Sequence, residues 1–300
     1  MTQQPPVTTR CGVVAIVGRP NVGKSTLMNH LIGQKISITS RKPQTTRHRI
    51  HGILTRDDYQ IIFADTPGIH REQQRALNRS MNNAAVTALE DVNLICFMVD
   101  ALKWTDADDY VLKLLRRVST PVVLVVNKVD TLEDKTRLLP HLSELAEKRE
   151  FVEVVPVSAL GGHNLNELEL ALARHLPESE FWYDEDQVTD RSLRFMAAEI
   201  VREKVFRQLG QELPHQVAVE VEVWEDTPTL TTISAAILVE RRGQKKILIG
   251  TGGDRIKKIG IDARRDIEAL IDRKVMLNLW VKIRSGWSDD ERALRSLGYD

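Results

Sequence analysis

The sequence predicts an α/β domain, with a mostly parallel sheet and helices on both faces, followed by a smaller α+β domain. Through residue 176, short apolar runs alternate with amphipathic stretches, which is typical of strands that alternate with helices in a parallel sheet. A glycine-rich turn joins the first of these strands to the first helix. Beyond an acidic stretch, the order of the elements changes, which indicates a second domain.

The elements of the first domain follow from apolar runs and helical spacing. We expect strands at 13–17, 50–55, 59–64, 94–99, 122–126 and 152–157. The second and third of these form a hairpin around Arg56-Asp57-Asp58. Helical patterns lie at 25–32, 107–117, 135–148 and 165–175.

The second domain follows an acidic linker. We expect residues 177–189 to join domains at 1–176 and 190–300, while Phe181, Trp182 and Tyr183 pack against one of the two. Asp190 is expected to cap a helix at 191–209. Alternating valines and glutamates predict a half-buried strand at 216–224. A strand at 231–240, a helix at 255–271 and a strand at 276–283 complete the order α-β-β-α-β.

Composition narrows the class of protein. A chain of 300 residues exceeds the roughly 100–200 residues of a typical domain, which favours two domains. Lys and Arg number 42, as do Asp and Glu, and this balance argues against a globally basic nucleic-acid binder. Cys11 and Cys96 are too few for a disulfide scaffold, and no apolar run approaches the roughly 20 residues of a membrane span. We therefore expect a cytoplasmic protein.

The turn after the first strand has the spacing of a phosphate-binding loop. Gly18-Arg19-Pro20-Asn21-Val22-Gly23-Lys24-Ser25 matches G-x-x-x-x-G-K-[ST] between a strand and a helix. In such a loop, backbone N–H groups and the helix N-terminus bind phosphate, Lys24 reaches the β- and γ-phosphates, and Ser25 ligates Mg²⁺. A dinucleotide fingerprint would need glycine in place of Pro20, and the run GTGGDR has Arg255 in place of its last glycine.

Three further motifs follow strand ends. Asp65-Thr66-Pro67-Gly68 offers a carboxylate for Mg²⁺ and a glycine N–H for the γ-phosphate. In Asn127-Lys128-Val129-Asp130, the last carboxylate can accept from the N1–H and N2 amine of guanine, a donor pair that adenine lacks. Ser158-Ala159-Leu160 offers backbone N–H groups to the guanine carbonyl. Because ligands of open α/β sheets bind at the carboxyl ends of strands, the sequence predicts a GTP site.

In this order, the four motifs resemble those of translation-factor-type GTPases. The resemblance implies a switch threonine after the phosphate loop, with Thr46 favoured and Thr45 also open, in a segment at 36–47 that is mobile until GTP orders it. It implies catalytic roles for Lys24, Thr46, Asp65 and Gly68, and Mg²⁺ ligation by Ser25, Thr46 and Asp65. The implied GTP-binding residues are Gly18, Arg19, Pro20, Asn21, Val22, Gly23, Lys24, Ser25, Thr26, Asp65, Thr66, Pro67, Gly68, Ile69, Asn127, Lys128, Asp130, Ser158, Ala159 and Leu160.

Two positions bear on how fast GTP is hydrolysed: one differs from Ras-like enzymes, and the other matches related GTPases that bind K⁺. Ile69 stands where Ras-like enzymes carry a water-positioning Gln, so we expect slow intrinsic hydrolysis. In related GTPases, an Asn at the position of Asn21 helps to bind K⁺. A role for Asn21 in shaping the loop alone is an equally good interpretation.

The second domain contains a candidate RNA clamp. Ile249-Gly250-Thr251-Gly252-Gly253 before a helix resembles the loop of a type II KH domain, which clamps the backbone of a single strand. Between residues 241 and 284, 13 Lys and Arg stand against 5 Asp and Glu, which favours RNA binding over a solvated turn. Relatives often carry a lysine in this loop, which is absent here. The expected RNA contacts are Gly250, Thr251, Gly252, Gly253, Lys245, Lys246, Lys257 and Lys258.

A single GTPase domain followed by a KH domain and the ending SGWSDDERALRSLG resembles the Era-like subfamily over nearly the whole chain. The resemblance implies GTP hydrolysis, binding to the 3′ end of small-subunit rRNA and assistance to small-subunit assembly, with no DNA partner. In some members it also implies peripheral contact with the cytoplasmic face of the inner membrane. Two alternatives stay open: a metabolic P-loop kinase, which the NKVD motif opposes, and a membrane-surface GTPase, which the lack of a strongly apolar helix face opposes.

Overall fold

The computed structural model describes residues 9–39, 50–65, 89, 91–101, 103–132, 136, 138–209, 217–290, 292 and 294. The chain divides into two compact units, and the residues from Arg191 onward belong to the second of them. Ile38 and Thr39 also belong to the second unit, although they lie early in the sequence. We describe each unit by itself.

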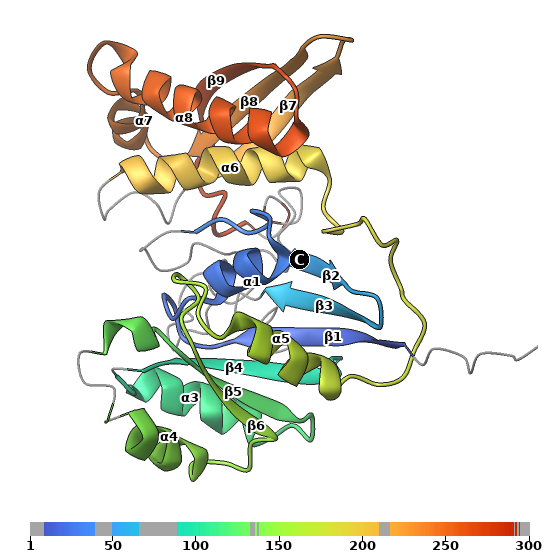
Figure 1. Ribbon diagram of the computed structural model, residues 1–300. Coiled ribbons are helices and arrows are strands. Elements are labelled where there is room, and N and C mark those ends of the chain that lie inside the picture. The colour runs from blue at the N-terminus through green and yellow to red at the C-terminus, as the bar shows by residue number, and fades with distance from the viewer. Residues whose placement is uncertain are drawn as a thin grey trace, which may run out of the picture. The chain divides into compact units, whose positions relative to one another are not determined.

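The first unit is built on a six-stranded sheet in the order β2-β3-β1-β4-β5-β6 (Figure 1). All neighbouring strands are parallel except β2 and β3, which form the antiparallel hairpin that the sequence predicts. The mostly parallel α/β fold is thereby confirmed. The strands are β1 (Arg10–Val17), β2 (Ile50–Thr55), β3 (Tyr59–Asp65), β4 (Leu94–Asp100), β5 (Val122–Asn127) and β6 (Glu153–Val157).

Helices bury the two faces of this sheet. Val111, Leu112 and Leu115 of α3 (Asp106–Leu115) and Leu145 of α4 (Leu138–Ala146) share a core cluster with alternate residues of β1, β4 and β5. The helices α1 (Lys24–Ile32) and α5 (Leu165–Arg174) lie outside this cluster and contact β1, β2, β3 and β6. Because successive side chains of a strand point to opposite faces, the two sets of helices cover opposite faces.

The predicted linker packs against the first unit. Phe181 and Tyr183 lie on a cluster of apolar strand residues: Cys11, Val13, Ile62 and Ala64. The fully buried Gln60 fixes their backbone, because its Oε1 accepts from the N–H groups of Trp182 and Tyr183 at 2.9 and 3.0 Å. The expectation that the aromatic residues pack against one unit is confirmed for Phe181 and Tyr183, whereas the Trp182 side chain is 54% exposed.

The second unit packs three helices on one three-stranded sheet. The order is α6 (Leu193–Gln208), β7 (Ala218–Asp226), β8 (Thr231–Val239), α7 (Arg242–Ile249), the short 3-10 helix η4 (Thr251–Gly253), α8 (Asp254–Ile271) and β9 (Val275–Ile283) (Figure 1). The central strand β8 is antiparallel to β7 and parallel to β9. Apolar residues of all three strands form one core with the three helices.

Three details of the second unit differ from the expectations. The sequence analysis missed α7, because it is short and basic and buries only Gln244 and Leu248. Ser192, not Asp190, caps α6, since its side chain accepts from the Phe195 N–H. In β7 the register shifts between Val221 and Val223, so the alternation of buried valines does not reach Val223, which is 37% exposed.

Candidate functional site

The phosphate loop bends sharply between β1 and α1, and its two outer glycines are required by close packing. Gly18 and Gly23 have φ values of 155° and 114°. A Cβ atom at Gly18 would lie 2.4 Å from the Met98 carbonyl oxygen, and one at Gly23 would lie 2.3 Å from the side-chain nitrogen of Asn127. A larger residue at either position would push the loop away from the sheet.

Lys24 is buried at the first turn of α1. Its Nζ donates to the carbonyl oxygens of Gly18 and Arg19, both at 3.1 Å. Burial lowers the pKa of Lys24 to about 8, an effect that the Asp65 carboxylate opposes and the Arg19 guanidinium reinforces. The poorly hydrated ammonium group is therefore placed to exchange loop carbonyls for phosphate oxygens.

Two side-chain oxygens meet at the edge of the phosphate loop. The Ser25 hydroxyl donates to Asp65 Oδ2 at 2.8 Å, and Asp65 is fully buried at the end of β3. Hydroxyl and carboxylate oxygens suit Mg²⁺, which binds few protein ligands and completes its shell with water and phosphate. In the described ranges, no group of three or more His, Cys, Asp or Glu could hold a metal ion. The pair therefore fits Mg²⁺ bound together with a nucleotide.

A second hydroxyl, which the sequence analysis did not single out, shares this carboxylate. Ser37 Oγ donates to the same Asp65 Oδ2 at 2.7 Å, and Ser37 is fully buried. Ile36 and Ile38 on either side are also buried. The expectation of a mobile polar segment from residue 36 is therefore wrong at its start, because residues 36–38 belong to the packed interior.

Asn127 joins the phosphate loop to the loop after β6. Its side-chain nitrogen donates to the Val22 carbonyl, and its Oδ1 accepts from the Ala159 N–H, both at 2.8 Å. Asn127 therefore holds the two loops to one another. Asp130 lies exposed in the short 3-10 helix η1 (Val129–Thr131), where its carboxylate is open to a ligand.

The loop after β6 is held from several sides. Ser158 is buried, and its hydroxyl accepts from the Gly161 N–H at 3.0 Å. His30 of α1, which the sequence analysis missed, hydrogen-bonds through Nδ1 to the Ala159 carbonyl. Leu160 is 79% exposed, so only its backbone can be positioned by this packing.

Two carboxylates that the sequence analysis also missed bind the Arg19 side chain of the phosphate loop, and one of them also pairs with Lys128 of the Asn127–Asp130 motif. Asp100, at the end of β4, lies 2.6 Å from Lys128 Nζ and 3.4 Å from the Arg19 guanidinium. The fully buried Asp108 accepts from Arg19 Nε at 3.1 Å. The Arg19 side chain is thus engaged by carboxylates, which leaves its backbone for a phosphate. Asp100 could have been anticipated as an acid at a strand end.

Several expected site residues are not part of the described structure. Thr45 and Thr46 lie outside the described residues, as do Thr66, Pro67, Gly68 and Ile69. The fit of Mg²⁺ is therefore argued from Ser25 and Asp65 alone.

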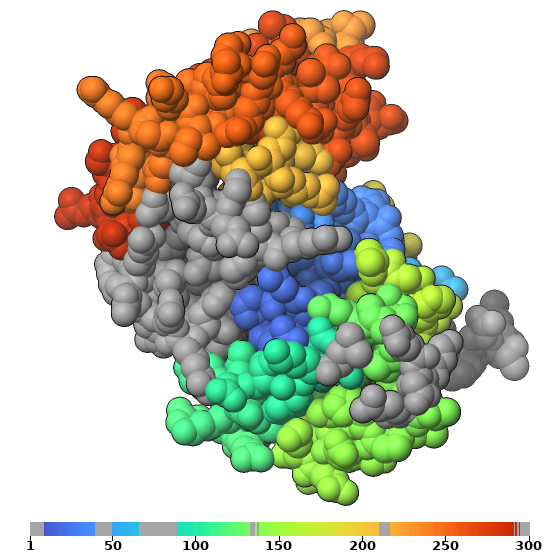
Figure 2. Space-filling model, turned by 90° about the vertical axis from the view of Figure 1, so that its left-hand side faces the viewer, coloured from blue at the N-terminus to red at the C-terminus, as the bar shows by residue number. Residues whose placement is uncertain are grey.

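The glycine loop of the second unit precedes α8 and is open on its outer side. Thr251 and Gly252 are exposed, and Gly252 has a φ of 61°. A Cβ at Gly250 would lie 3.1 Å from the Arg255 backbone nitrogen, so glycine is needed there. The lysines around the loop are Lys245, which is half-buried, and Lys246, Lys257 and Lys258, which are exposed. Residues 241–265 form an open surface, orange in Figure 2.

A groove that the sequence analysis did not identify runs between α8 and β9. It has a volume of about 320 Å³, and its walls combine aliphatic side chains with two cations: Ile256, Lys257, Gly260, Ile261, Arg264, Leu277 and Leu279. An apolar floor beside a basic rim suits the bases and phosphates of a single strand. Of the residues that line the groove, only Lys257 was predicted to contact RNA. The others have the spacing of ordinary helix and strand residues, so the sequence did not indicate a role for them.

Comparison with known proteins agrees with the assignment of a GTPase domain and a KH domain. Residues 13–128 match the family of 50S ribosome-binding GTPases, and residues 212–288 match the KH domain. The GTPase Era of Ectopseudomonas mendocina is 58% identical to this chain, over 100% of this chain and 99% of the relative. The GTPase Era of Pseudomonas fluorescens is 60% identical over 97% of each chain.

Two solved structures are similar to the whole chain. Each has a TM-score of 0.94 and 40% sequence identity, and each alignment covers 97% of this chain and 99% of the other. One is a variant of Aquifex aeolicus Era bound to GDP·AlF4⁻. The other is Era in complex with MgGDPNP and nucleotides 1506–1542 of 16S ribosomal RNA.

We expect nucleotide affinity to fall as Lys24 loses its proton. The pKa of Lys24 is about 8 without nucleotide, and an anionic phosphate favours the charged form. Binding of Mg²⁺-GDP should therefore weaken about fourfold between pH 7 and pH 8.5, with proton uptake, as measured by calorimetry in several buffers. In Lys24→Met, affinity is lower and this part of the pH dependence disappears. The same pH dependence in the parent and the variant would contradict the assignment.

Gly260 offers a test of the groove. A Cβ at Gly260 would lie 3.7 Å from Leu279 Cδ1, an ordinary contact, so alanine fits. Because glycine inside a helix costs about 0.5–1 kcal/mol relative to alanine, Gly260→Ala should stabilise the protein by about that amount in urea unfolding. The added methyl group occupies the groove, so single-stranded RNA should bind at least about threefold more weakly in fluorescence anisotropy.

Gly243→Ala is the matched control. Gly243 lies in α7, which does not line the groove, and has no atom within 4 Å of its Cβ position. Alanine there should add similar stability and leave RNA binding in the groove unchanged. Unchanged RNA affinity in Gly260→Ala would mean that this part of the groove does not hold RNA.

Proposed function

Because the chain belongs to the Era family of GTPases, we propose that it couples GTP hydrolysis to binding of the 3′ end of small-subunit rRNA and assists assembly of that subunit. The observation that carries the proposal is the groove between α8 and β9, with its apolar floor and basic rim next to the glycine loop. A relative that is similar over 97% of this chain is Era in complex with 16S rRNA nucleotides. Membership of this family excludes the metabolic kinase.

The matching family is described as 50S ribosome-binding GTPases, a description that refers to the large ribosomal subunit and not to the small one. That match covers residues 13–128, which lie mostly in the GTPase unit and contain no part of the groove. The similarity to Era with 16S rRNA extends over both units. We therefore favour the small subunit, since the proposed RNA contacts lie in the second unit.

Each residue of the proposed GTP site has a separate role. Lys24 holds the β- and γ-phosphates, and Ser25, Asp65 and Thr46 hold Mg²⁺, which neutralises the charge on the phosphates when it is bound. The Gly68 N–H meets the γ-phosphate, and Asp130 selects guanine. Ile69 has no polar group to orient water, so intrinsic hydrolysis is slow.

We also propose that K⁺ supports hydrolysis through Asn21. The side chain of Asn21 is exposed, and its φ of 61° is a left-handed conformation that asparagine tolerates. The same conformation explains Asn21 through loop shape alone, so the two roles need separate variants.

Hydrolysis should be faster in K⁺ than in Na⁺ at equal ionic strength, as measured by phosphate release. Asn21→Ala should abolish this difference. Asn21→Gly keeps the backbone freedom but removes the side-chain oxygen, and it should abolish the difference as well. A K⁺ effect that survives in Asn21→Gly would assign Asn21 to loop shape.

The cytoplasm as location and peripheral contact with the inner membrane are further proposals. In the part of the chain that the structure describes, no helix is long and apolar enough to cross a membrane. The basic surface of residues 241–265 is the part that would meet anionic lipid, and RNA competes for it.

The clamp is tested by adding negative charge. Thr251→Asp combined with Gly252→Asp should weaken binding of RNA with the 3′ sequence of small-subunit rRNA at least tenfold, about 1.4 kcal/mol, in anisotropy titrations. GTP hydrolysis should stay within about twofold, because distant sites act independently. Affinity should also fall as salt rises, through release of phosphate counterions.

The matched control places the same charges elsewhere in the unit. Pro228→Asp with Thr229→Asp lies in the turn before β8, where Thr231 pairs with Val275 at the far end of α8 from the glycine loop. This variant should bind RNA like the parent. If the glycine-loop variant is folded by circular dichroism and also binds like the parent, the loop is only a turn.

A further inference from the structure

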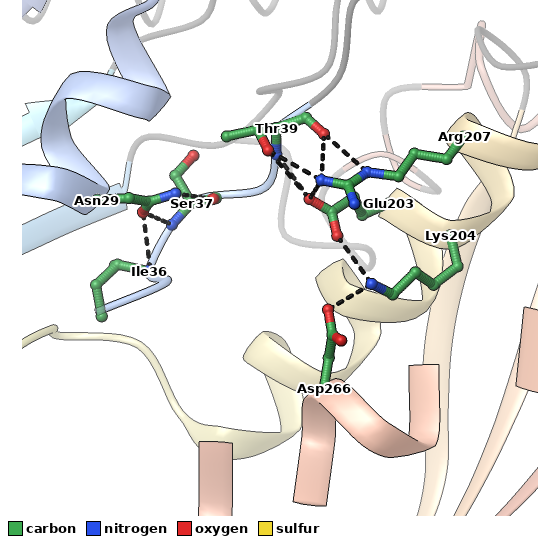
Figure 3. Close-up of polar contacts among 8 residues, drawn as sticks. All are labelled: Asn29, Ile36, Ser37, Thr39, Glu203, Lys204, Arg207 and Asp266. Carbon is green, nitrogen blue, oxygen red and sulfur yellow. Dashed lines mark hydrogen bonds and ion pairs between the residues drawn. The ribbon is translucent and has the colours of Figure 1, made fainter. Parts of the chain in front are cut away.

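The short segment 36–39 passes from one unit to the other, and its first half is fixed to the GTPase unit. The boundary between the units falls between Ser37 and Ile38. Asn29 Oδ1 accepts from the N–H groups of Ile36 and Ser37 at 2.9 and 2.8 Å (Figure 3). Its Nδ2 donates to the Ser37 carbonyl at 2.7 Å. Three hydrogen bonds from one carboxamide therefore hold this backbone to α1.

The side chain of Ser37 connects the same segment with the proposed Mg²⁺ site. Its hydroxyl and that of Ser25 donate to one oxygen of Asp65, at 2.7 and 2.8 Å. A carboxylate oxygen has two lone pairs, so these two donors already fill Oδ2. Any further ligand of this oxygen competes with the Ser37 hydroxyl. The position of Ser37 therefore depends on what occupies the GTP site.

Two residues later, the second unit holds the backbone. The Thr39 N–H donates to Glu203 Oε1 at 3.0 Å (Figure 3). The same oxygen accepts from Arg207 at 3.0 Å, and Arg207 lies 3.2 Å from the Thr39 hydroxyl. Glu203 is fully buried in α6. A buried carboxylate needs its partners, so Thr39 is bound strongly at this point.

Glu203 is also joined to the helix that lines the RNA groove. Its Oε2 lies 3.4 Å from Lys204 Nζ, and Lys204 pairs with Asp266 of α8. Lys204 is itself 7% exposed, so this link is shielded from solvent. Side chains thus connect Thr39 with the helix that begins at the glycine loop.

We propose that Glu203 is a positioning residue that couples the GTP site to the RNA site by holding Thr39 while Asn29 and Asp65 hold Ile36 and Ser37. Two residues span at most about 7 Å, so the chain between the two anchors has little slack. If a change at Asp65 moves Ser37, then the backbone of Ile38 must change its conformation or Thr39 must move as well. The nucleotide and the RNA then affect each other's affinity by the same factor, because coupling between sites is reciprocal. The inference rests on the proposed function, since it requires both ligands to bind.

The test measures how far the nucleotide changes RNA affinity. Anisotropy titrations with RNA of the small-subunit 3′ sequence give a dissociation constant with MgGDP and another with MgGDPNP. In the parent we expect the two to differ by at least about fivefold, the lower end of typical coupling. In Glu203→Ala the ratio should fall to within twofold of one. Glu203→Gln, which keeps an acceptor oxygen for Thr39, should retain most of the ratio.

A matched control and a direct probe separate coupling from general damage. Glu199→Ala removes another buried carboxylate of α6, whose described ion pair is with Arg202, and it should leave the ratio unchanged. Hydrogen exchange without nucleotide or Mg²⁺ should be faster at the Thr39 amide in Glu203→Ala than in the parent and in Glu203→Gln. Unchanged exchange at this amide would overturn the proposed anchor.

The outcomes distinguish this inference from the proposed function. If the parent binds RNA equally well with both nucleotides, or Glu203→Ala keeps the full ratio, the inference is overturned and the proposed function stands. If the parent binds this RNA with neither nucleotide, the proposed function fails and the inference fails with it.

Discussion

The buried carboxamide of Asn127 is the interaction on which the GTP site depends. It bonds to the phosphate loop on one side and to the loop after β6 on the other. The parallel register makes this bridge available, since Asn127 pairs with Asp100 of β4 and with Val157 of β6. A buried amide that lost these partners would cost about 1–3 kcal/mol for each unsatisfied group. The loops that carry phosphate and base recognition are therefore held to one another as well as to the sheet.

Buried charge is concentrated in α6 of the second unit. Glu199 and Arg202 form a pair at 2.5 Å, and both are nearly inaccessible to solvent. Such pairs add little net stability, because desolvation offsets their attraction, but loss of one partner is costly. Buried ion pairs do determine which side chains face one another. In α6 they favour one defined packing of the side chains around Glu203, which its hydrogen bond with the Thr39 N–H requires.

The groove between α8 and β9 combines an open surface with residues that lower the stability of the second unit. The chain has no net charge, yet residues 241–284 carry a large excess of Lys and Arg, so the basic field is local. Gly260 interrupts a long helix at a place where a side chain would fill the groove. Ile261, 39% exposed on the same wall, leaves apolar surface in water. Each feature weakens the isolated unit slightly and suits a ligand that is both apolar and anionic.

The sequence by itself determined the features that reside in consecutive residues. The phosphate loop, the strand-end motifs and the glycine loop were identified from spacing, because each needs particular residues next to one another in the chain. The alternation of strands and helices was also readable, since burial on sheet faces leaves long apolar runs. The short helix α7 was missed because two buried residues leave almost no periodic signal.

Only the tertiary structure decided which distant residues support these motifs. Several supporting contacts join residues that are far apart in the sequence. They are the contacts of Asp100 and Asp108 with Arg19, of His30 with Ala159, and of Ser37 with Asp65. The groove joins α8 to Leu277 and Leu279, and Glu203 reaches Thr39 across more than half the chain. Such contacts depend on strand order, register and the packing of one element on another. A serine or an aspartate in a sequence has no local pattern that names its partner, so these roles could not be predicted before the fold was known.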